Sequence, residues 1–238
     1  MLLEAGGAAI SAGVGFLVYA VRGRSATVLA PSVWRGSKNR KAIALTFDDG
    51  PSESTPLLLD LLEAHHAHAT FFQIGRHVER HPEISRRAHR SGHEIGNHSY
   101  SHSPLYLRHA QFIEDEISLC QQAIQDATGA APTLFRAPYG CRWFGLREAQ
   151  QRHRLTGVMW TTIAADWKLD AKRIHRRMKR GAQPGAILCL HDGRELRPKP
   201  DVRKTLEAVG RLLPELREQG YHLVTVSELL CRKPPSNA

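Results

Sequence analysis

The chain has 238 residues and a mass of 26.6 kDa, which is enough for one domain with a sizeable core. Hydrophobic residues make up 42% of the sequence and charged residues 24%, which excludes wholesale disorder and a protein with many membrane spans. The net charge of +10 favours anionic surroundings or a well-solvated surface, but no nucleic-acid-binding motif accompanies it, so we predict no nucleic-acid partner.

The N-terminal run of residues 5–21 carries no charge and is rich in glycine and alanine. It is short for a membrane span and long for the core of a signal peptide. We predict that residues 1–22 form a membrane anchor or signal segment and that residues 23–40 form a basic tether; a buried core helix is the alternative. Basic residues follow the run, so the positive-inside rule would keep the main domain cytoplasmic.

From residue 41 onward, short β-rich runs alternate with segments of helical periodicity. Strands are predicted at 41–47, 69–75, 94–98, 133–140, 155–163, 185–192 and 221–226. Helices are predicted at 55–65, after Pro82, and at 109–128, 145–153, 171–181 and 202–220. Such alternation implies an α/β domain over residues 41–230 with a parallel sheet, either open or closed into a barrel. Residues 231–238 are predicted to form a disordered tail.

Polar side chains follow most of the predicted strands. The pairs at successive strand ends are Asp48 and Asp49, His98 and His102, Arg136 and Tyr139, Asp166 and Trp167, and His191 and Asp192. The carboxyl ends of parallel strands meet at one end of the sheet, and active sites of β/α folds are built there. These residues are therefore predicted to converge on one site although they are distant in sequence.

His98 and His102 form the sequence HSYSH directly after a predicted strand. With 14 histidines in the chain, HxxxH pairs also arise by chance, and two others occur, 77/81 and 89/93. Neither of these follows a strand, so we predict surface histidines there. The pair at 98 and 102 alone is a candidate ligand pair, suited to Zn²⁺, Co²⁺, Ni²⁺ or Fe²⁺.

The adjacent carboxylates Asp48 and Asp49 precede Gly50-Pro51, a pattern that is also typical of turns and helix N-caps. At a strand end, one carboxylate could bind a metal while the other accepts a proton from an attacking water. Two histidines and one carboxylate would leave coordination positions open, as catalytic metal sites do.

Arg136 and His191 each allow two interpretations. At an apolar strand end, an arginine pairs with a carboxylate more readily than it lies free on the surface. His191 follows the apolar run 186–190 and is either a buried, hydrogen-bonded histidine or a general acid that faces the metal.

Four widely spaced cysteines form no CxxC motif and indicate no disulfide framework; Cys189 is predicted to be a small core residue.

In this order, five motifs resemble those of the polysaccharide deacetylase family, also called the NodB-homology domain or carbohydrate esterase family 4. They are TFDDGP (46–51), HSYSH (98–102), RAPYG (136–140), DW (166–167) and LHD (190–192). The resemblance spans about residues 41–230 and implies a distorted (β/α)7 barrel. It also implies metal-dependent removal of acetyl groups from an N-acetylated glycan partner, either chitooligosaccharide or peptidoglycan.

The same resemblance implies a role for each candidate residue. Asp49, His98 and His102 would bind a divalent metal, with Zn²⁺ as first choice and Co²⁺ as second. Asp48 would be the base that activates water, and His191 would be the acid that protonates the leaving amine. An amide needs both, because it is a poor electrophile with a poor leaving group.

Four further residues would assist by the same resemblance. Arg136 would orient the base, and Asp166 would orient and polarise the acid. The backbone N–H of Tyr139 would help to stabilise the tetrahedral oxyanion, and Trp167 would form a wall of the acetyl pocket.

Two positions depart from the family pattern. Many relatives carry a further aspartate three residues before the Asp of DW, where this chain has Ile163. Relatives usually have a leucine two residues before the acid histidine, lining the acetyl pocket, where this chain has Cys189. Neither change removes a metal ligand, the base or the acid, so we expect activity with an altered pocket shape or substrate choice.

Three alternative functions remain open at this point. The same machinery could cleave O-acetyl esters of xylan. Two histidines and one carboxylate also describe a non-haem Fe(II) oxygenase, although the adjacent Asp48 and Asp49 and the β/α alternation disfavour it. An inactive glycan-binding scaffold is the third.

Polymer substrates favour an outward-facing domain at the cell envelope, whereas the flanking charges favour the cytoplasm. The sequence indicates no oligomeric state.

Overall fold

Strand β2 (Ala42–Gly50) lies at the centre of the protein and is buried along its whole length. The computed structural model describes residues 13–194 and 200–231. Strand β2 pairs in parallel with β3 (Thr70–Gln73) and β8 (Ile187–His191), and at its start with β9 (His222–Leu223). Its first part, Ala42–Leu45, is apolar on both faces, as expected for a parallel strand that is covered on both sides.

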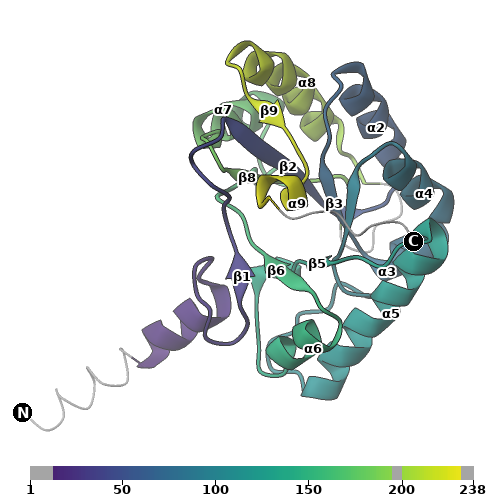
Figure 1. Ribbon diagram of the computed structural model, residues 1–238, viewed down its shortest axis with the longest axis vertical. Helices are drawn as coiled ribbons and strands as arrows, with labels where there is room; N and C mark the ends of the chain where they lie inside the picture. Colours follow the sequence, from purple (N-terminus) through teal and green to yellow (C-terminus); the bar gives the residue numbers. More distant parts are fainter. Residues whose placement is uncertain (1–12, 195–199, 232–238) are drawn as a thin grey trace, which may run out of the picture.

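The other strands extend this centre into a curled parallel sheet (Figure 1). They are β1 (Ser32–Val33), β4 (Glu94–Asn97), β5 (Leu134–Phe135), β6 (Thr156–Val158) and β7 (Thr162–Ile163). The order across the sheet is β1-β6-β5-β4-β3-β2-β8-β7, with all of these neighbours parallel. The predicted α/β class is therefore confirmed.

Helices flank the sheet on its outside (Figure 1). The described helices after β1 are α2 (Thr55–Ala64), α3 (Gly75–Arg80), α4 (Pro82–Arg90), α5 (Ala110–Thr128), α6 (Leu146–Arg152), α7 (Ala171–Gly181), α8 (Arg203–Glu218) and α9 (Val226–Leu229). A short 3-10 turn covers Pro138–Gly140. Leucine and isoleucine side chains of the helices pack with β2 and β3 into the main core.

The segment predicted as one strand over 155–163 forms two strands at different places in the sheet. β6 lies next to β5 and β1, whereas β7 lies next to β8 at the other end of the strand order. Residues 159–161 join them: the Met159 N–H donates to Val33 O at 2.7 Å, and the Thr161 N–H donates to Ile187 O at 2.9 Å. This short connection draws the two ends of the sheet together, which gives the sheet its barrel-like curl.

The segment predicted as a tether is folded against the domain. Ala26, Leu29 and Ala30 are buried, and β1 pairs with β6. Ala30 belongs to a second core cluster together with Phe135 and neighbouring apolar residues. Residues 23–33 of the predicted basic tether are therefore held against the domain by apolar burial and strand pairing.

Part of the predicted anchor also lies within the structure. Residues 13–22 form a helix whose apolar side chains Val14, Phe16, Leu17 and Val18 are exposed, whereas Ala20 is buried. None of the helices in the described ranges is both long enough and apolar enough to cross a membrane. Residues 1–12 of the predicted anchor and 232–238 of the predicted tail lie outside the described residues.

Buried Arg142 connects this N-terminal segment to the domain. Its guanidinium donates to the carbonyl oxygens of Ala26, at 3.0 Å, and Gly23, and its backbone N–H donates to Val21 O at 3.0 Å. The side chain is almost fully buried, and burial lowers the pKa of Arg142. The contacts are hydrogen bonds to backbone carbonyls, which a non-polar side chain cannot replace.

We predict that Arg142→Met lowers the free energy of unfolding by about 2–4 kcal/mol, because two carbonyls lose a charged donor. Residues 23–30 should also become more accessible to trypsin, which cleaves after Arg24. Urea denaturation and limited proteolysis measure the two effects. Arg152→Met, at an exposed residue paired with Glu114, is the control and should change stability by less than about 1 kcal/mol. Equal stabilities of the two variants would contradict the prediction.

Candidate active site

The carboxyl ends of the central strands meet at an open pocket of about 720 Å³. Strands β2 and β8 are paired so that Asp48 lies opposite His191. The predicted site residues that line this pocket are Asp48, Asp49, His98, His102, Tyr139, Trp167 and His191. The other two predicted site residues, Arg136 and Asp166, are buried behind it and contact residues of the lining. The structure thus brings together every residue to which a role is assigned, whereas Asp192 is buried outside the lining and its Oδ2 accepts from Thr55 Oγ1 at 2.6 Å.

Asp49, His98 and His102 form a buried group in this pocket. The Nε2 atoms of His98 and His102 lie 3.4 Å and 3.2 Å from Asp49 Oδ1. The candidate ligand atoms of all three residues lie within 4.8 Å of one another. Two imidazole nitrogens and one carboxylate oxygen are a donor set that suits Zn²⁺ and similar divalent cations.

The protonation of this group also fits a cation. His98 Nδ1 lies 2.7 Å from Arg136 O, which can only accept, so Nδ1 carries a proton and Nε2 is the nitrogen that faces Asp49. Burial and the neighbouring His98 lower the pKa of His102 to about 4, so this ring is neutral at pH 7. Burial raises the pKa of Asp49, but its contacts with His98 and His102 outweigh this and hold the pKa well below its usual range.

Asp48 is held by a fully buried arginine. Arg136 Nη1 donates to Asp48 Oδ1 at 2.6 Å and to Thr46 Oγ1 at 2.7 Å. The guanidinium also lies over the Phe72 ring, 4.0 Å from its centroid, and its Nε donates to Val158 O at 3.3 Å. Contacts on several sides fix the plane of the guanidinium and, through it, the orientation of the Asp48 carboxylate.

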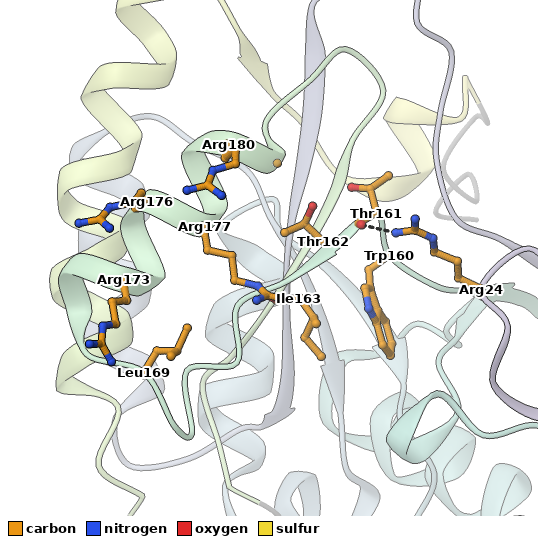
Figure 2. A pocket seen from close by; sticks show the side chains of 11 residues that line it. Arg24, Trp160, Thr161, Thr162, Ile163, Leu169, Arg173, Arg176, Arg177 and Arg180 are labelled. Atoms are coloured by element: carbon orange, nitrogen blue, oxygen red, sulfur yellow. Dashed lines mark hydrogen bonds between the residues drawn. The ribbon is translucent and has the colours of Figure 1, made fainter.

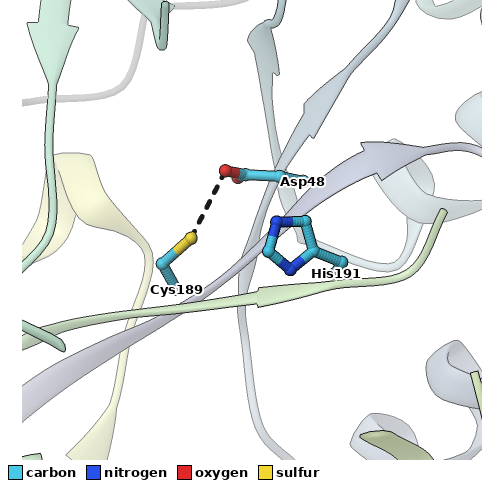
Figure 3. A group of neighbouring side chains, drawn as sticks. All are labelled: Asp48, Cys189 and His191. Carbon is cyan, nitrogen blue, oxygen red and sulfur yellow. Dashed lines mark hydrogen bonds between the residues drawn. The ribbon is translucent and has the colours of Figure 1, made fainter. Parts of the chain in front are cut away.

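Cys189 lies beside Asp48, with its sulfur directed at the Asp48 carboxylate (Figure 3). Its thiol donates to Asp48 Oδ2 at 3.3 Å, so both carboxylate oxygens of Asp48 have a partner. Asp48, Cys189 and His191 form a second close group of ligand-type side chains. Burial raises the pKa of Cys189 well above that of an ordinary thiol, so the sulfur keeps its proton. The geometry therefore makes Cys189 a hydrogen-bond donor that positions Asp48.

His191 faces the pocket from β8, the strand next to β2, and is paired with Asp166. His191 Nδ1 lies 2.8 Å from Asp166 Oδ1, and the His191 backbone N–H donates to Asp166 Oδ2 at 2.9 Å. Thr205 Oγ1 on α8 donates to the same Oδ2 at 2.9 Å. Burial lowers the pKa of His191, but the hydrogen bond and charge of Asp166 outweigh it and raise this pKa to about 9. At neutral pH, His191 is thus a protonated donor whose Nε2–H is free to face a substrate.

Tyr139 and Trp167 are half-exposed walls of the pocket. The Trp167 ring stands edge-on to His191, with centroids 5.3 Å apart, and the Tyr139 ring lies 4.7 Å from that of His102. Asp49, His102 and Tyr139 all have positive φ angles of 71°, 57° and 57°. Strained backbone of this kind concentrates at functional sites, where it aims side chains and backbone N–H groups.

The prediction that the other HxxxH pairs are surface histidines is wrong for one member of each pair. His77 is buried on α3, and its Nδ1 lies 2.9 Å from Asp49 O. His93 is buried as well, and its Nδ1 accepts from the Ala69 N–H at 3.3 Å. His77 therefore supports the backbone of the candidate ligand Asp49. A contact with a backbone carbonyl leaves no pattern in the sequence by which it could be found.

A family model described as polysaccharide deacetylase matches residues 35–158, just over half of the chain. The chain belongs to the polysaccharide deacetylase family. This confirms the resemblance that the five sequence motifs indicated.

Three members of the polysaccharide deacetylase family illustrate the similarity. A peptidoglycan-N-acetylglucosamine deacetylase of Bacillus cereus is 37% identical, with 83% of this chain and 92% of that protein aligned. A chitooligosaccharide deacetylase of Azorhizobium caulinodans is 36% identical, with 79% and 94% aligned. The peptidoglycan-N-acetylglucosamine deacetylase PgdA of Listeria monocytogenes is 36% identical over 83% of this chain, which spans 40% of that protein's length.

Solved structures of the polysaccharide deacetylase family share the fold. The Bc1960 peptidoglycan N-acetylglucosamine deacetylase superposes with a TM-score of 0.79 and 30% identity, covering 84% of this chain and 92% of that one. BA3943 of Bacillus anthracis, described as a pseudoenzyme of the same family, has a TM-score of 0.76 and 29% identity, covering 85% and 69%. The expected distorted (β/α)7 barrel is confirmed. Because the fold also supports a pseudoenzyme, activity must be argued from site residues.

The two departures from the polysaccharide deacetylase motifs lie in different places. Ile163 lines the pocket directly, at the end of β7. Cys189 is fully buried and does not belong to the lining, because its thiol points to Asp48. The expected effect on pocket shape therefore applies to Ile163, whereas Cys189 acts on the carboxylate.

Proposed function

We propose that this chain is a metal-dependent hydrolase that removes N-acetyl groups from glycans containing N-acetylglucosamine. The proposal rests on three groups of side chains that meet at one pocket. They are the candidate metal ligands Asp49, His98 and His102, the Asp48–Arg136 pair and the His191–Asp166 pair. The names of the relatives support the same substrate class, since they include peptidoglycan-N-acetylglucosamine and chitooligosaccharide deacetylases.

Asp49, His98 and His102 would hold the metal, with Zn²⁺ as first choice and Co²⁺ as second. Three protein donors leave coordination positions open, as in catalytic sites. When bound, the cation supplies a Lewis acid that polarises the acetamide carbonyl and lowers the pKa of water. The Nδ1 contact that turns His98 Nε2 toward the group and the neutral ring of His102 support this role.

Asp48 and His191 divide the proton transfers between them. Asp48 takes the proton from the attacking water, and Arg136 keeps the carboxylate oriented toward the pocket. His191 gives its proton to the nitrogen of the leaving amine, and Asp166 keeps His191 protonated until that moment. Two groups on neighbouring strands avoid the need for one residue to act as base and acid in turn.

The remaining pocket residues shape the acyl end of the reaction. The Tyr139 backbone N–H is proposed to donate to the developing oxyanion, because Tyr139 lines the pocket beside the candidate ligand His102. Trp167 is proposed to wall the space that receives the acetyl methyl group, because its ring packs beside His191.

The cell envelope is the proposed place of action, because peptidoglycan is named as substrate for several relatives. The exposed apolar side chains of residues 13–18 support the proposal that the N-terminal run is an anchor or signal segment. That helix ends at Arg22, whose side chain lines the catalytic pocket. The N-terminal segment thus also contributes to the rim of the site.

Metal removal tests the proposed function. Stripping the protein with a chelator should abolish acetate release from chitooligosaccharide and from de-O-acetylated peptidoglycan, and stoichiometric Zn²⁺ or Co²⁺ should restore it. Glucosamine should appear in the product. The metal content of His98→Ala, measured by mass spectrometry, should fall in parallel with activity, because one donor of the group is lost. Acetate release from acetylxylan but from neither amide substrate would indicate an O-acetyl esterase. Activity that survives chelation would contradict the proposal.

A further inference from the structure

A second groove, of about 600 Å³, lies beside the catalytic pocket along β7 and α7. Five arginines and no acidic residue line it. Figure 2 shows Arg173, Arg176, Arg177 and Arg180 on α7 at one side and Arg24 at the other. Uncharged residues of β7 and its neighbours lie between them.

The spacing along α7 explains why the four arginines share one face. Positions 176, 177 and 180 follow position 173 by three, four and seven residues, which places all four on one stripe about 10 Å long. The opposite stripe, with Ile174 and Met178, is buried in the main core. The core contact therefore turns the basic stripe toward the groove.

Two of these arginines are available to a ligand. Arg177 Nε donates to Ile163 O at 2.6 Å, and Arg173 is 3.4 Å from Asp170. Arg176 and Arg180 form no ion pair with any acidic residue in the described part of the chain. By contrast, Lys179 on the same helix is paired with Glu215 at 2.9 Å. Uncompensated guanidinium groups in a groove are the donor arrangement that carboxylates and phosphates bind.

The groove is continuous with the catalytic pocket. Trp160 and Ile163 line both, and Arg177 is hydrogen-bonded to the backbone of Ile163 at their border. A chain that places an acetamido group at His191 can therefore continue past Ile163 into the groove. An anion bound there would then belong to the substrate itself rather than to a separate partner.

We propose that this groove binds carboxylates carried by the same glycan strand that is deacetylated. The preferred substrate is then an anionic glycan, with carboxylates from stem peptides or from lactyl ethers, rather than a neutral chitin oligomer. This inference rests on the proposed deacetylase function and adds the charge of the substrate. The guanidinium groups of Arg176 and Arg180 on α7 would donate to these carboxylates. Ile163 at the border is uncharged, so no negative charge there weakens the positive potential of the groove.

The test compares Arg176→Gln/Arg180→Gln with the wild-type protein. Glutamine keeps the helix propensity of exposed positions and removes two charges. The matched control is Lys172→Gln/Lys204→Gln, which removes two exposed charges outside the groove. Substrates are peptidoglycan fragments that bear stem peptides, the same glycan after amidase treatment, which exposes lactyl carboxylates, and a chitooligosaccharide of matched length. Dissociation constants by calorimetry and kcat/KM by acetate release are both measured, at low and high salt.

We expect the groove variant to lose about tenfold or more in affinity and kcat/KM for the anionic fragments, with the loss reduced at high salt. Values for the neutral oligomer and for the control variant should stay within about twofold. Whichever anionic fragment loses more identifies the source of the carboxylate. An unchanged affinity for both fragments, or an equal loss on the neutral oligomer, overturns the inference. So does tighter binding of an oligonucleotide or of anionic vesicles. If the wild type releases no acetate from any glycan, the proposed function fails. The dissociation constants from calorimetry still show whether the groove binds the anionic fragments.

Discussion

Replacing Asp48 with asparagine is expected to lower kcat by about 10²–10⁴-fold while the metal content stays unchanged. Asparagine has the shape of aspartate, and its carbonyl oxygen can still accept from Arg136 Nη1. It cannot take a proton from water. Because the candidate metal ligands are Asp49, His98 and His102, the loss should fall on the chemical step and leave metal binding intact. Acetate release and metal analysis on the same sample measure the two quantities.

Asp60→Asn is the matched control for this variant. Asp60 is exposed on α2, where it pairs with Arg87, and it lies outside the catalytic pocket. Its kcat should equal that of the wild type. Near-normal turnover of Asp48→Asn with metal bound would show that the assigned base is wrong. Loss of the metal together with activity would show that Asp48 acts as a ligand.

The long, well-patterned elements of the fold could be predicted from the sequence. Strand β2 carries a continuous apolar run over Ala42–Leu45, and α5 buries one face of 19 residues before Gly129 ends it with a positive φ of 80°. Such elements satisfy their hydrogen bonds and bury their apolar faces within one continuous stretch. Periodicity therefore identifies them without knowledge of their partners.

The elements that were missed are short and depend on distant partners. Strands β1 and β7 have two residues each, and α3 has six. β6 and β7 were predicted as one strand because residues 155–163 are uniformly β-rich, whereas pairing with β5 and with β8 splits them. The pattern of polar and apolar residues along a strand indicates which face is buried. It does not indicate which neighbouring strand the segment pairs with, or where that neighbour changes.

The candidate site was more predictable than the segments around it. Its side chains stand at strand ends, and the parallel topology alone brings strand ends together. The supporting contacts were not predictable, since His77 reaches Asp49 through a backbone carbonyl and Arg142 holds residues 23–26 in the same way. Every residue has a backbone carbonyl, so the sequence gives no sign that those of Gly23 and Ala26 accept from Arg142. The basic residues at 22 and 24 therefore led to the prediction of a tether.

Replacing Asp166 with asparagine is expected to move the alkaline limb of kcat/KM to lower pH by about two units. Burial lowers the pKa of His191, whereas the hydrogen bond and charge of Asp166 raise it to about 9. As the proposed acid, His191 works while it is protonated, so wild-type activity should persist below pH 9 and fall as the pH rises through that value. Without the Asp166 charge, burial dominates, and His191 loses its proton at lower pH.

At pH 8, the Asp166→Asn variant should therefore lose about 10–100-fold in kcat/KM, with a smaller loss at pH 6. Asparagine can still accept from the His191 backbone N–H and from Thr205, so the position of the ring is retained. Asp126→Asn, at an exposed residue of α5, should leave the pH profile unchanged. A uniform loss at all pH values would mean that Asp166 only positions the ring. A shift of the alkaline limb with little loss at low pH would establish that its charge keeps the acid protonated.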